Sequence, residues 1–341
     1  MSARRILVAM SGGVDSSVAA ALLKAQGHDV RGVTCLLFPG QTNAASRAQA
    51  VAHFLGIPFD VLDLSELFES KVIKPFCHAY HAGRTPNPCV VCNRCVKFGA
   101  LTEHALACGA SHLATGHYAR TLCTGDYKLL KASDLSKDQS YFLHALTQSQ
   151  LEMAVFPLGE ITKTEVRATA TRLGLTGLIK GSESQDICFV PDGDYASFVT
   201  KDQKAVPGEI VDGDGKILGK HRGLVYHTIG QRKGLGIAAA APLYVTRLDA
   251  QRNQVVVGPK EALWRTELTA SNLSWISGKA PDNPSGITAR VRSKSSEVAV
   301  NIAVTNDTLQ VSFHSPQWAV APGQSIVFYH GDEVLGGAII D

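Results

Sequence analysis

Residues 6–23 read ILVAMSGGVDSSVAAALL, and this stretch decides the fold. The apolar run at residues 6–10 is typical of a buried strand, and the paired glycines Gly12 and Gly13 predict a tight turn. The residues from Asp15 onward favour a helix. Glycines let backbone N–H groups approach a ligand closely, and a helix N-terminus attracts anions. The stretch therefore predicts a phosphate cradle between a strand and a helix.

The cradle differs from the two commonest nucleotide-binding loops. No lysine follows the glycines, as a Walker A loop requires, and the dinucleotide pattern G-x-G-x-x-G is not present. An ordinary tight turn is the alternative for any pair of glycines. The complete string SGGVDSS, which directly follows a strand, favours the cradle.

The chain around this loop alternates strands with helices as far as about residue 200. Further apolar strands are predicted at residues 29–38, 58–64 and 111–119, and helices at 43–56, 98–109 and 162–174. Near-continuous apolar strands that alternate with helices are typical of a parallel sheet covered on both faces. Thr162, with Glu165 three residues later, predicts the N-cap of the last helix. We therefore predict an α/β doubly wound parallel sheet in residues 1–200.

The pattern changes after this point to short β-rich runs separated by turn residues. A hairpin is predicted at residues 207–219, and further runs lie at 242–249, 254–259, 286–292, 297–305, 309–314 and 325–340. Such runs predict mostly antiparallel sheets in two small units. We expect a small central β domain at residues 201–265 and a C-terminal β-barrel-like domain at residues 266–341.

The composition is that of a soluble globular protein, because 45% of the residues are hydrophobic and 18% are charged. No apolar run approaches the roughly 20 residues that span a bilayer. The short apolar stretch near the N-terminus meets glycines and predicts a strand rather than a signal peptide. We therefore expect a cytoplasmic protein whose eight cysteines are thiols, ligands or catalysts rather than structural disulfides.

Cysteines are the second chemical feature. Cys89, Cys92 and Cys95 follow one another at intervals of three residues, and Cys188 lies far along the chain. The spacing alone leaves open a metal site, a disulfide, or sulfur that takes part in chemistry.

Positive charge gathers in one segment, although the net charge of the whole chain is only +3. Residues 216–236 contain no Asp or Glu but contain five basic residues, Lys216, Lys220, Arg222, Arg232 and Lys233. Such a segment favours contact with a nucleic-acid backbone, and a solvated surface is the alternative.

The loop resembles the pyrophosphatase loop of ATP-dependent adenylating enzymes, which have an adenine nucleotide alpha hydrolase-like fold. Longer strings resemble a narrower group, the bacterial tRNA-specific 2-thiouridylases. These strings are TPNPCVVCNRCVKFGAL, ATGHYAR, KDQSYFL, SQDICFV, GLVYHTIGQRKGLGI and APGQSIVFYHGDEVLGGAIID, and they run in order to the last residue. The resemblance implies a tRNA-uridine 2-sulfurtransferase with a doubly wound catalytic domain and two small β domains. Such an enzyme adenylates the 2-oxygen of the wobble uridine with ATP and then replaces it with sulfur from a cysteine persulfide.

The resemblance also implies an ATP site, in which Mg²⁺ screens the phosphates. It assigns ATP contacts to Ala9, Met10, Ser11, Gly12, Gly13, Val14, Asp15, Ser16, Cys35 and Gly116. The side chain of Cys35 is equally well explained as a buried apolar group.

The resemblance assigns the sulfur chemistry to two cysteines, with Cys92 as the nucleophile and Cys188 as the persulfide carrier. The chain departs from the family at Cys89, where well-known members have an aspartate that is a candidate acid–base group. A second reading therefore stays open, in which Cys89, Cys92 and Cys188 hold a four-iron cluster. A zinc site that includes Cys95 is a third reading. We assign the acid–base role to no residue.

The expected partner is tRNA, which by resemblance means the isoacceptors for Glu, Gln and Lys, and an upstream persulfide donor supplies the sulfur. A uridine in a stacked anticodon loop must flip out to reach a cleft. The resemblance assigns the base pocket to Asn87, Pro88 and Cys89, and further tRNA contacts to His117, Asp138, Gln139, Ser140, Arg290, Val291 and Gln324.

Two rival functions are weighed against this one. An amidotransferase-type adenylating synthetase would not need paired distant cysteines, and an RNA-binding metal scaffold would not need the SGGVDSS loop. The sequence leaves the oligomeric state open.

Overall fold

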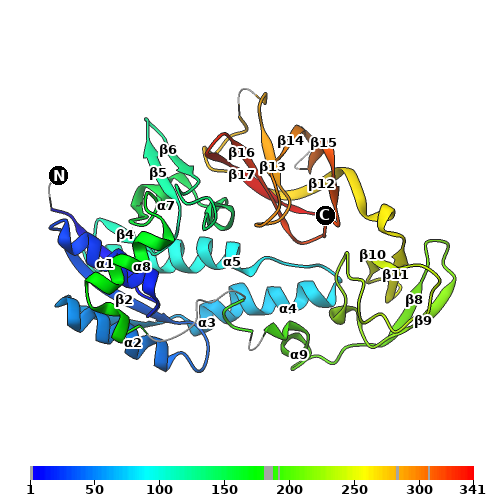
Figure 1. The fold of residues 1–341 in the computed structure, drawn as a ribbon, viewed down its shortest axis with the longest axis horizontal. Coiled ribbons are helices and arrows are strands. Elements are labelled where there is room, and N and C mark those ends of the chain that lie inside the picture. The colour runs from blue at the N-terminus through cyan, green and yellow to red at the C-terminus, as the bar shows by residue number, and fades with distance from the viewer. Residues whose placement is uncertain (1–2, 180–186, 191–192, 282–283, 306–307) are drawn as a thin grey trace.

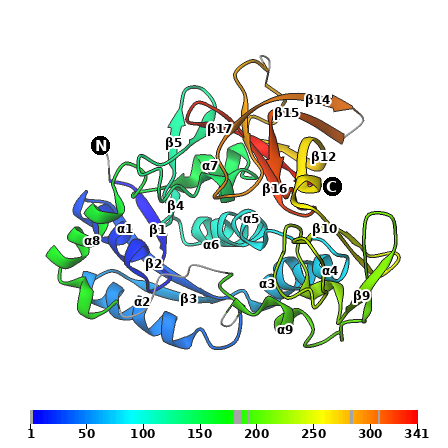
Figure 2. The ribbon, with the colours of Figure 1, turned by 45° about the vertical axis from the view of Figure 1, so that its right-hand side comes forward.

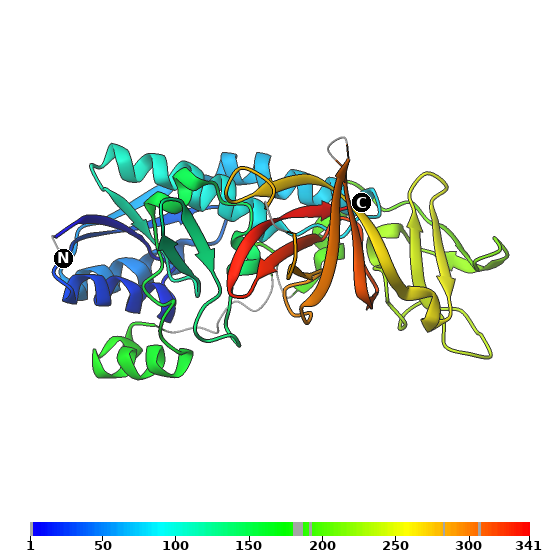
Figure 3. The same cartoon turned by 90° about the horizontal axis from the view of Figure 1, so that it is seen from above.

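The computed structural model describes residues 3–179, 187–190, 193–281, 284–305 and 308–341. The parallel sheet with the N-terminus lies at one end of the molecule, and the small central β domain lies at the other (Figure 1). The C-terminal strands lie between these two ends, as the view from above shows (Figure 3).

The first domain contains a five-stranded parallel sheet in the order β3-β2-β1-β4-β7. Its strands are β1 (Arg5–Ala9), β2 (Asp29–Leu36), β3 (Phe59–Asp63), β4 (His112–Ala114) and β7 (Ala154–Val155). Successive residues of β1 enter different cores, since side chains of a strand alternate between faces. Ile6 and Val8 pack in one core, and Leu7 packs in the other.

Helices cover both faces of this sheet, which confirms the doubly wound prediction. Three of them, α1 (Val14–Ala25), α2 (Thr42–Leu55) and α8 (Lys163–Arg172), pack on the face of Ile6 and Val8. On the other face lies α6 (Leu101–Ala107). The N-cap prediction for α8 is also confirmed, because Thr162 and Glu165 form a reciprocal capping box.

Two long helical segments between β3 and β4 were predicted only in part. The first consists of α3 (Ser65–Phe68), a π-helical stretch (Glu69–Ile73) and α4 (Lys74–His81). The second consists of α5 (Pro88–Val91), a π-helical stretch (Cys92–Ala100) and α6. These segments lie between the parallel sheet and the β domains (Figure 2). The second segment matters most, because it carries the run of cysteines.

The C-terminal strands close into a barrel. These strands are β12 (Trp264–Trp275), β13 (Thr288–Arg290), β14 (Val298–Thr305), β15 (Thr308–Trp318), β16 (Ser325–His330) and β17 (Glu333–Ile340). Strand β12 pairs with both β15 and β17, so the circle of hydrogen bonds is complete. An unpredicted hairpin of the first domain, β5 (Arg120–Cys123) and β6 (Tyr127–Leu130), extends this sheet at β17.

The central sheet has the order β10-β11-β8-β9. Its strands are β8 (Gly208–Val211), β9 (Ile217–His221), β10 (Tyr244–Asp249) and β11 (Gln254–Gly258). The hairpin predicted at residues 207–219 is confirmed by the antiparallel pair β8 and β9. Strands β8 and β11 are parallel, which is a local exception to the antiparallel pattern predicted for this half.

Short helices complete the described chain. They are α7 (Gln148–Met153), α9 (Tyr195–Val199) and the 3₁₀ turns Ser140–Leu143, Leu175–Gly177, Leu224–Tyr226 and Lys260–Leu263.

Candidate active site

The glycine loop has the form of a built cradle. Gly13 is the N-cap residue of α1, and its carbonyl accepts hydrogen bonds from the hydroxyls of Ser16 (3.2 Å) and Ser17 (2.8 Å). The backbone N–H of Ser11 donates to the Ser16 hydroxyl (3.1 Å). At Gly12 the φ angle is +75°, and a Cβ atom would lie 2.6 Å from the carbonyl oxygen of Ala44. The loop is therefore rigid, and its second position accepts only glycine.

The segment after β4 passes directly against this cradle. A Cβ atom on Gly116 would lie 2.7 Å from the backbone nitrogen of Ser16 and 2.9 Å from the carbonyl carbon of Asp15. Both segments stand at the carboxyl edge of the parallel sheet, where open α/β sheets bind ligands. The structure therefore brings together the two parts of the predicted ATP site.

Asp15 is held by two residues that the sequence analysis did not single out. The ammonium of Lys163 contacts both carboxylate oxygens of Asp15 (2.7 and 2.8 Å), and the Tyr118 hydroxyl donates to one of them (2.8 Å). Lys163 is buried, whereas the Asp15 side chain is 30% exposed. Lys163 directly follows the predicted N-cap Thr162, but no local pattern links it to a loop 148 residues away.

The cysteines of the second helical segment lie at its N-terminal end. Cys89 belongs to α5, and the π-helical stretch begins at Cys92, which is buried. A π-helical stretch inside a helix is frequent at functional sites. No local sequence pattern predicted this irregularity.

Cys188 lies near this segment because its neighbour Phe189 packs in a cluster that the segment shares. The Phe189 ring packs edge-on against Phe68 (5.5 Å between centroids) and Phe76 (5.2 Å) in the hydrophobic cluster that contains Cys92. Cys188 itself is exposed, and all eight cysteines are free thiols. Residues 184–186 of the SQDICFV string lie outside the described residues.

The titration of the thiols indicates that they share one small region. Burial raises the pKa values of Cys89 and Cys92, and it raises that of Cys35 to about 12. The pKa of Cys188 rises to about 11, because of desolvation by the surrounding chain and then because of the charges of Cys92 and Cys89. The resting thiols are therefore protonated near neutral pH.

One cation, Lys97, opposes the rise of the thiol pKa values. The charge of Lys97 lowers the pKa of each of the four thiols Cys35, Cys89, Cys92 and Cys188. Lys97 follows Cys92 by five residues in the π-helical stretch, whose hydrogen bonds join residues five apart. Both side chains therefore lie on one side of the segment.

His117 positions this lysine. Burial and the neighbouring Lys97 charge keep the pKa of His117 well below its usual value, so the imidazole is neutral. Nε2 lies 3.5 Å from the Lys97 ammonium and accepts from it, so Nδ1 carries the proton and donates to the Thr115 hydroxyl (2.8 Å). His117 directly follows Gly116, so these contacts link the cradle to Lys97, whose charge acts on the thiols.

Several residues predicted to contact tRNA also make contacts at a domain junction. The Asp138 carboxylate is 1% exposed, accepts from the Ser140 hydroxyl (2.9 Å) and pairs with Arg290 (3.4 Å). Ser140 and Val291 are buried, and the Gln139 side chain accepts from the backbone N–H of Tyr118 (3.0 Å). These side chains make hydrogen bonds or packing contacts within the protein. A tRNA contact here would therefore come from backbone atoms or from exposed neighbours.

Gln324 occupies a different position, at a hollow of about 330 Å³ where the three parts of the chain meet. The hollow is also lined by Thr85 of the first domain, Thr228 of the central domain, and Arg292 and Lys294 of the barrel. The Gln324 amide donates to the Thr85 carbonyl (2.8 Å). The two cations, which the sequence analysis missed, make this hollow suitable for an anionic ligand such as a nucleic-acid phosphate.

Other predicted residues have simpler positions. Asn87 is the N-cap residue of α5, and Pro88 is buried at the first position of that helix. Met10 is buried, and its backbone N–H donates to the Val33 carbonyl (2.8 Å). The five Lys and Arg side chains of the basic segment are all exposed, and the Arg222 guanidinium lies 3.9 Å from the centre of the Tyr226 ring.

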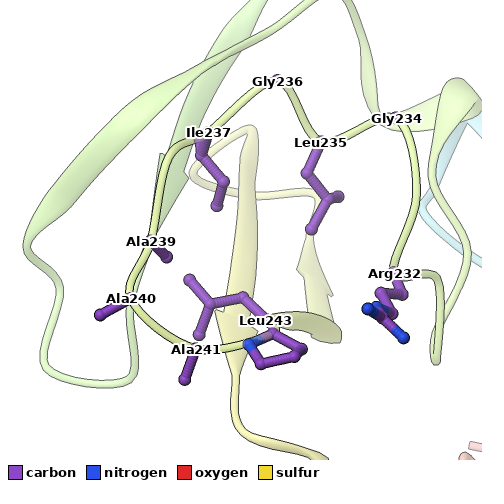
Figure 4. A pocket seen from close by; sticks show the side chains of 10 residues that line it. Arg232, Gly234, Leu235, Gly236, Ile237, Ala239, Ala240, Ala241 and Leu243 are labelled. Atoms are coloured by element: carbon purple, nitrogen blue, oxygen red, sulfur yellow. The ribbon is translucent and has the colours of Figure 1, made fainter.

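A second hollow, of about 390 Å³, lies within the loop at residues 232–243 of the central domain (Figure 4). Leu235, Ile237 and Leu243 point toward its interior, and Arg232 lies at its edge. It contains no thiol, histidine or carboxylate, so it has none of the groups that the predicted reaction needs.

Among the described residues, no helix has the length and apolar character needed to cross a membrane.

Comparisons with known proteins agree with this division of the chain. Residues 4–192 match the family profile described as the tRNA methyl transferase HUP domain. Residues 196–259 match the tRNA methyl transferase PRC-barrel domain, and residues 265–340 match the aminomethyltransferase beta-barrel domain.

Full-length relatives are also similar. The chain is 50% identical to the tRNA-specific 2-thiouridylase MnmA of Syntrophotalea carbinolica, over 99% of this chain and 98% of that protein. It is 48% identical to the protein of the same name from Geobacter metallireducens, over 99% and 97% of the two chains. Among solved structures, the U34-tRNA thiolase NcsA from Methanococcus maripaludis with its [4Fe-4S] cluster is 18% identical, with a TM-score of 0.39 over 59% of this chain and 64% of that one.

Proposed function

The chain belongs to the family of tRNA-specific 2-thiouridylases and is a tRNA sulfurtransferase, and we propose that it exchanges the 2-oxygen of the wobble uridine for sulfur in two stages, of which the first consumes ATP. Family membership also sets aside the two rivals, the amidotransferase-type synthetase and the non-enzymatic scaffold.

The first stage is adenylation of the uracil 2-oxygen. The oxygen attacks the α-phosphorus of ATP, pyrophosphate leaves, and AMP remains on the oxygen as a good leaving group. We assign the phosphates to the cradle of Ser11–Ser16 and the adenine side to Ala9, Met10, Cys35 and Gly116. Mg²⁺ would screen the phosphates. The position of Gly116 against the start of α1 supports this assignment.

The second stage is sulfur transfer. The terminal sulfur of a Cys188 persulfide attacks C2 of the uracil, and AMP leaves with its bonding electrons. The Cys92 thiolate then attacks the Cys188 sulfur, so that the bond between the two persulfide sulfurs breaks and the transferred sulfur stays on C2. The products are 2-thiouridine and a Cys92–Cys188 disulfide, which an external thiol reductant reopens. Lys97 stabilises the thiolates that form in these steps.

One observation carries the proposal. Gly116 packs against the cradle, the adjacent His117 contacts Lys97, and Lys97 lies on the same side of the π-helical stretch as Cys92. A reaction that passes an activated uridine from ATP to a thiol needs these two sites side by side.

The alternative of a four-iron cluster is favoured by one feature, the thiol at Cys89. Cys89 and Cys92 lie one turn apart, and both influence the titration of Cys188, so the three thiols suit a cluster with one open iron. A bound cluster would supply an iron that presents sulfide to the activated uridine. In that reading the same three residues act as ligands rather than as nucleophile and carrier.

We propose that the tRNA anticodon loop reaches the site with its wobble uridine flipped out. Asn87, Pro88 and Cys89 would line the base pocket, and His117 would face it. The hollow at Gln324, with Arg292 and Lys294, and the exposed basic side chains of residues 216–236 support contacts to the RNA backbone. The isoacceptors for Glu, Gln and Lys and an upstream persulfide donor are part of this proposal.

Under this proposal, residues 1–200 bind ATP and carry the chemistry, residues 201–265 form the central β domain, and residues 266–341 help to hold the RNA. We test it with purified enzyme, ATP, tRNA and a persulfide donor. Release of pyrophosphate that requires tRNA, together with 2-thiouridine found by nucleoside mass spectrometry, is the expected result. Pyrophosphate release without tRNA, or tRNA that gains no sulfur, would contradict it.

A further inference from the structure

Three ligand-type side chains gather on the face of the parallel sheet that α6 covers. They are Asp60 of β3, His104 of α6, and Cys108, which directly follows that helix. One carboxylate oxygen, one imidazole nitrogen and the thiol sulfur all lie within 4.8 Å of one another. The proposed reaction uses none of these groups.

The position of the group in the fold separates it from the catalytic thiols. Asp60 belongs to the edge strand β3, and β2 separates this strand from β1 and the cradle that follows it. The helical segment that begins with the catalytic cysteines ends at His104 and Cys108. The segment therefore carries one group of sulfur ligands at each end.

The geometry of the group is that of a metal site. His104 and Cys108 stand four residues apart at the end of a helix, so they lie on one face. The Cys108 sulfur lies 3.5 Å from His104 Nε2. Tetrahedral zinc with a Zn–S bond of about 2.3 Å and a Zn–N bond of about 2.0 Å separates its sulfur and nitrogen ligands by roughly 3.5 Å. The observed distance between these two atoms is therefore the one that a shared zinc ion would require.

Asp60 is already oriented by a second residue. Arg31 of β2 donates from Nε to one carboxylate oxygen and from its terminal nitrogen to the other (2.7 Å). A carboxylate has about four lone-pair positions, so two hydrogen bonds leave room for a metal. Residues that hydrogen-bond a metal-bound carboxylate are a regular part of metal sites, and Arg31 fits that role.

We propose that Asp60, His104 and Cys108 bind one Zn²⁺ ion, with a water molecule as the fourth ligand. A thiolate, an imidazole and a carboxylate are the ligand types that zinc takes in proteins. The ion would tie α6 to β3, which is an edge strand of the sheet. It would thereby anchor the far end of the segment that carries Cys92.

The test is zinc binding by the full chain under reducing conditions, after removal of metal with a chelator. Zn²⁺ is titrated in competition with a chromophoric chelator, and equivalents per chain are counted. Cys108→Ser and His104→Ala are each expected to lose one equivalent or to bind it at least about tenfold more weakly. Arg31→Gln is expected to weaken the same equivalent by about 10- to 100-fold, as changes around a metal site do. The matched controls are Cys123→Ser and His53→Ala, which alter an exposed cysteine and a histidine on other elements. Both controls are expected to bind as many zinc equivalents per chain as the unaltered protein.

A second variant and a second metal distinguish zinc at the proposed site from zinc bound at the catalytic thiols. In Cys92→Ser/Cys188→Ser protein, Co²⁺ is expected to give a sulfur-to-cobalt charge-transfer band that disappears when Cys108→Ser is added. Zinc should also raise the thermal midpoint of the Cys92→Ser/Cys188→Ser protein but not that of the triple variant. A full zinc count and an unchanged cobalt spectrum in Cys108→Ser protein would overturn the proposal. Should Cys108→Ser fail to fold, His104→Gln and Arg31→Gln give the same decision.

Discussion

Gly116 offers a direct test of the contact between the cradle and the segment after β4. The substitution Gly116→Ala places a Cβ atom 2.7 Å from the Ser16 nitrogen, 2.9 Å from the Asp15 carbonyl carbon and 3.1 Å from the Asp15 Cβ. Ordinary contacts begin at 3.4 Å, so the closest of these is 0.7 Å too short. Two of the three neighbours are backbone atoms, so a side-chain rotation does not relieve the clash.

The expected magnitude follows from this overlap. Overpacking of this kind costs about 1–3 kcal/mol of folding free energy. Relief requires the helix start or the segment after β4 to move by several tenths of an ångström. A misplacement of about 1 Å lowers catalysis by about 100-fold. We therefore expect kcat/KM for tRNA-dependent pyrophosphate release to fall by about 10- to 100-fold when ATP is varied.

The assay pairs this kinetic measurement with two others, filter binding of tRNA and urea unfolding. tRNA affinity is expected to stay near that of the unaltered enzyme, since the overlap faces the cradle. Gly177→Ala is the matched control, because a Cβ atom there meets nothing within 4 Å. It should keep full activity and be neutral or more stable by roughly 0.4–1 kcal/mol. Gly116→Ala enzyme with an unchanged kcat/KM for ATP would refute the proposed position of the nucleotide.

Three further predictions concern the thiols. Lys97→Met removes the charge that lowers the thiol pKa values, so the pH profile of the Cys188 alkylation rate should move to higher pH. The rate is measured by peptide mass spectrometry, and an unchanged profile would contradict the role of Lys97. Cys188→Ser should still release pyrophosphate with tRNA but form no 2-thiouridine, whereas normal thiolation would exclude Cys188 as the carrier. Cys89→Asp should keep substantial activity in enzyme prepared in air if the persulfide mechanism operates, and Cys95→Ser should be tolerated as the control. An iron content near four per chain in anaerobic protein, lost together with activity in Cys89→Asp, would establish the cluster instead.

The sequence predicted those parts of the site that depend on neighbours along the chain. The strand, glycine turn and helix of residues 6–23 are local, and the same holds for the capping box at Thr162 and Glu165. Alternation of strands and helices then fixed the parallel sheet, because a parallel pair needs a crossover.

The parts that were missed depend on contacts between distant segments. Lys163 reaches Asp15 across 148 residues, and a lone lysine at a helix start has no pattern that reveals such a partner. The hairpin of β5 and β6 is too short to be distinguished from a loop, and it is stabilised by pairing with β17. The ion pair of Asp138 and Arg290 was not predicted for the same reason, since an ion pair across a domain junction leaves no periodic signal.

The replacement of an aspartate by Cys89 has an electrostatic consequence for the sulfur site. The Cys89 thiol carries no charge near neutral pH, because burial raises its pKa. A carboxylate at this position would add a negative charge one turn from Cys92, whose pKa is already raised by burial. Lys97 would then be shared between the carboxylate and the thiolates. With a neutral thiol at position 89, no carboxylate competes for the Lys97 charge, so we expect Cys89→Asp to move the alkylation profile of Cys92 to higher pH even where turnover is kept.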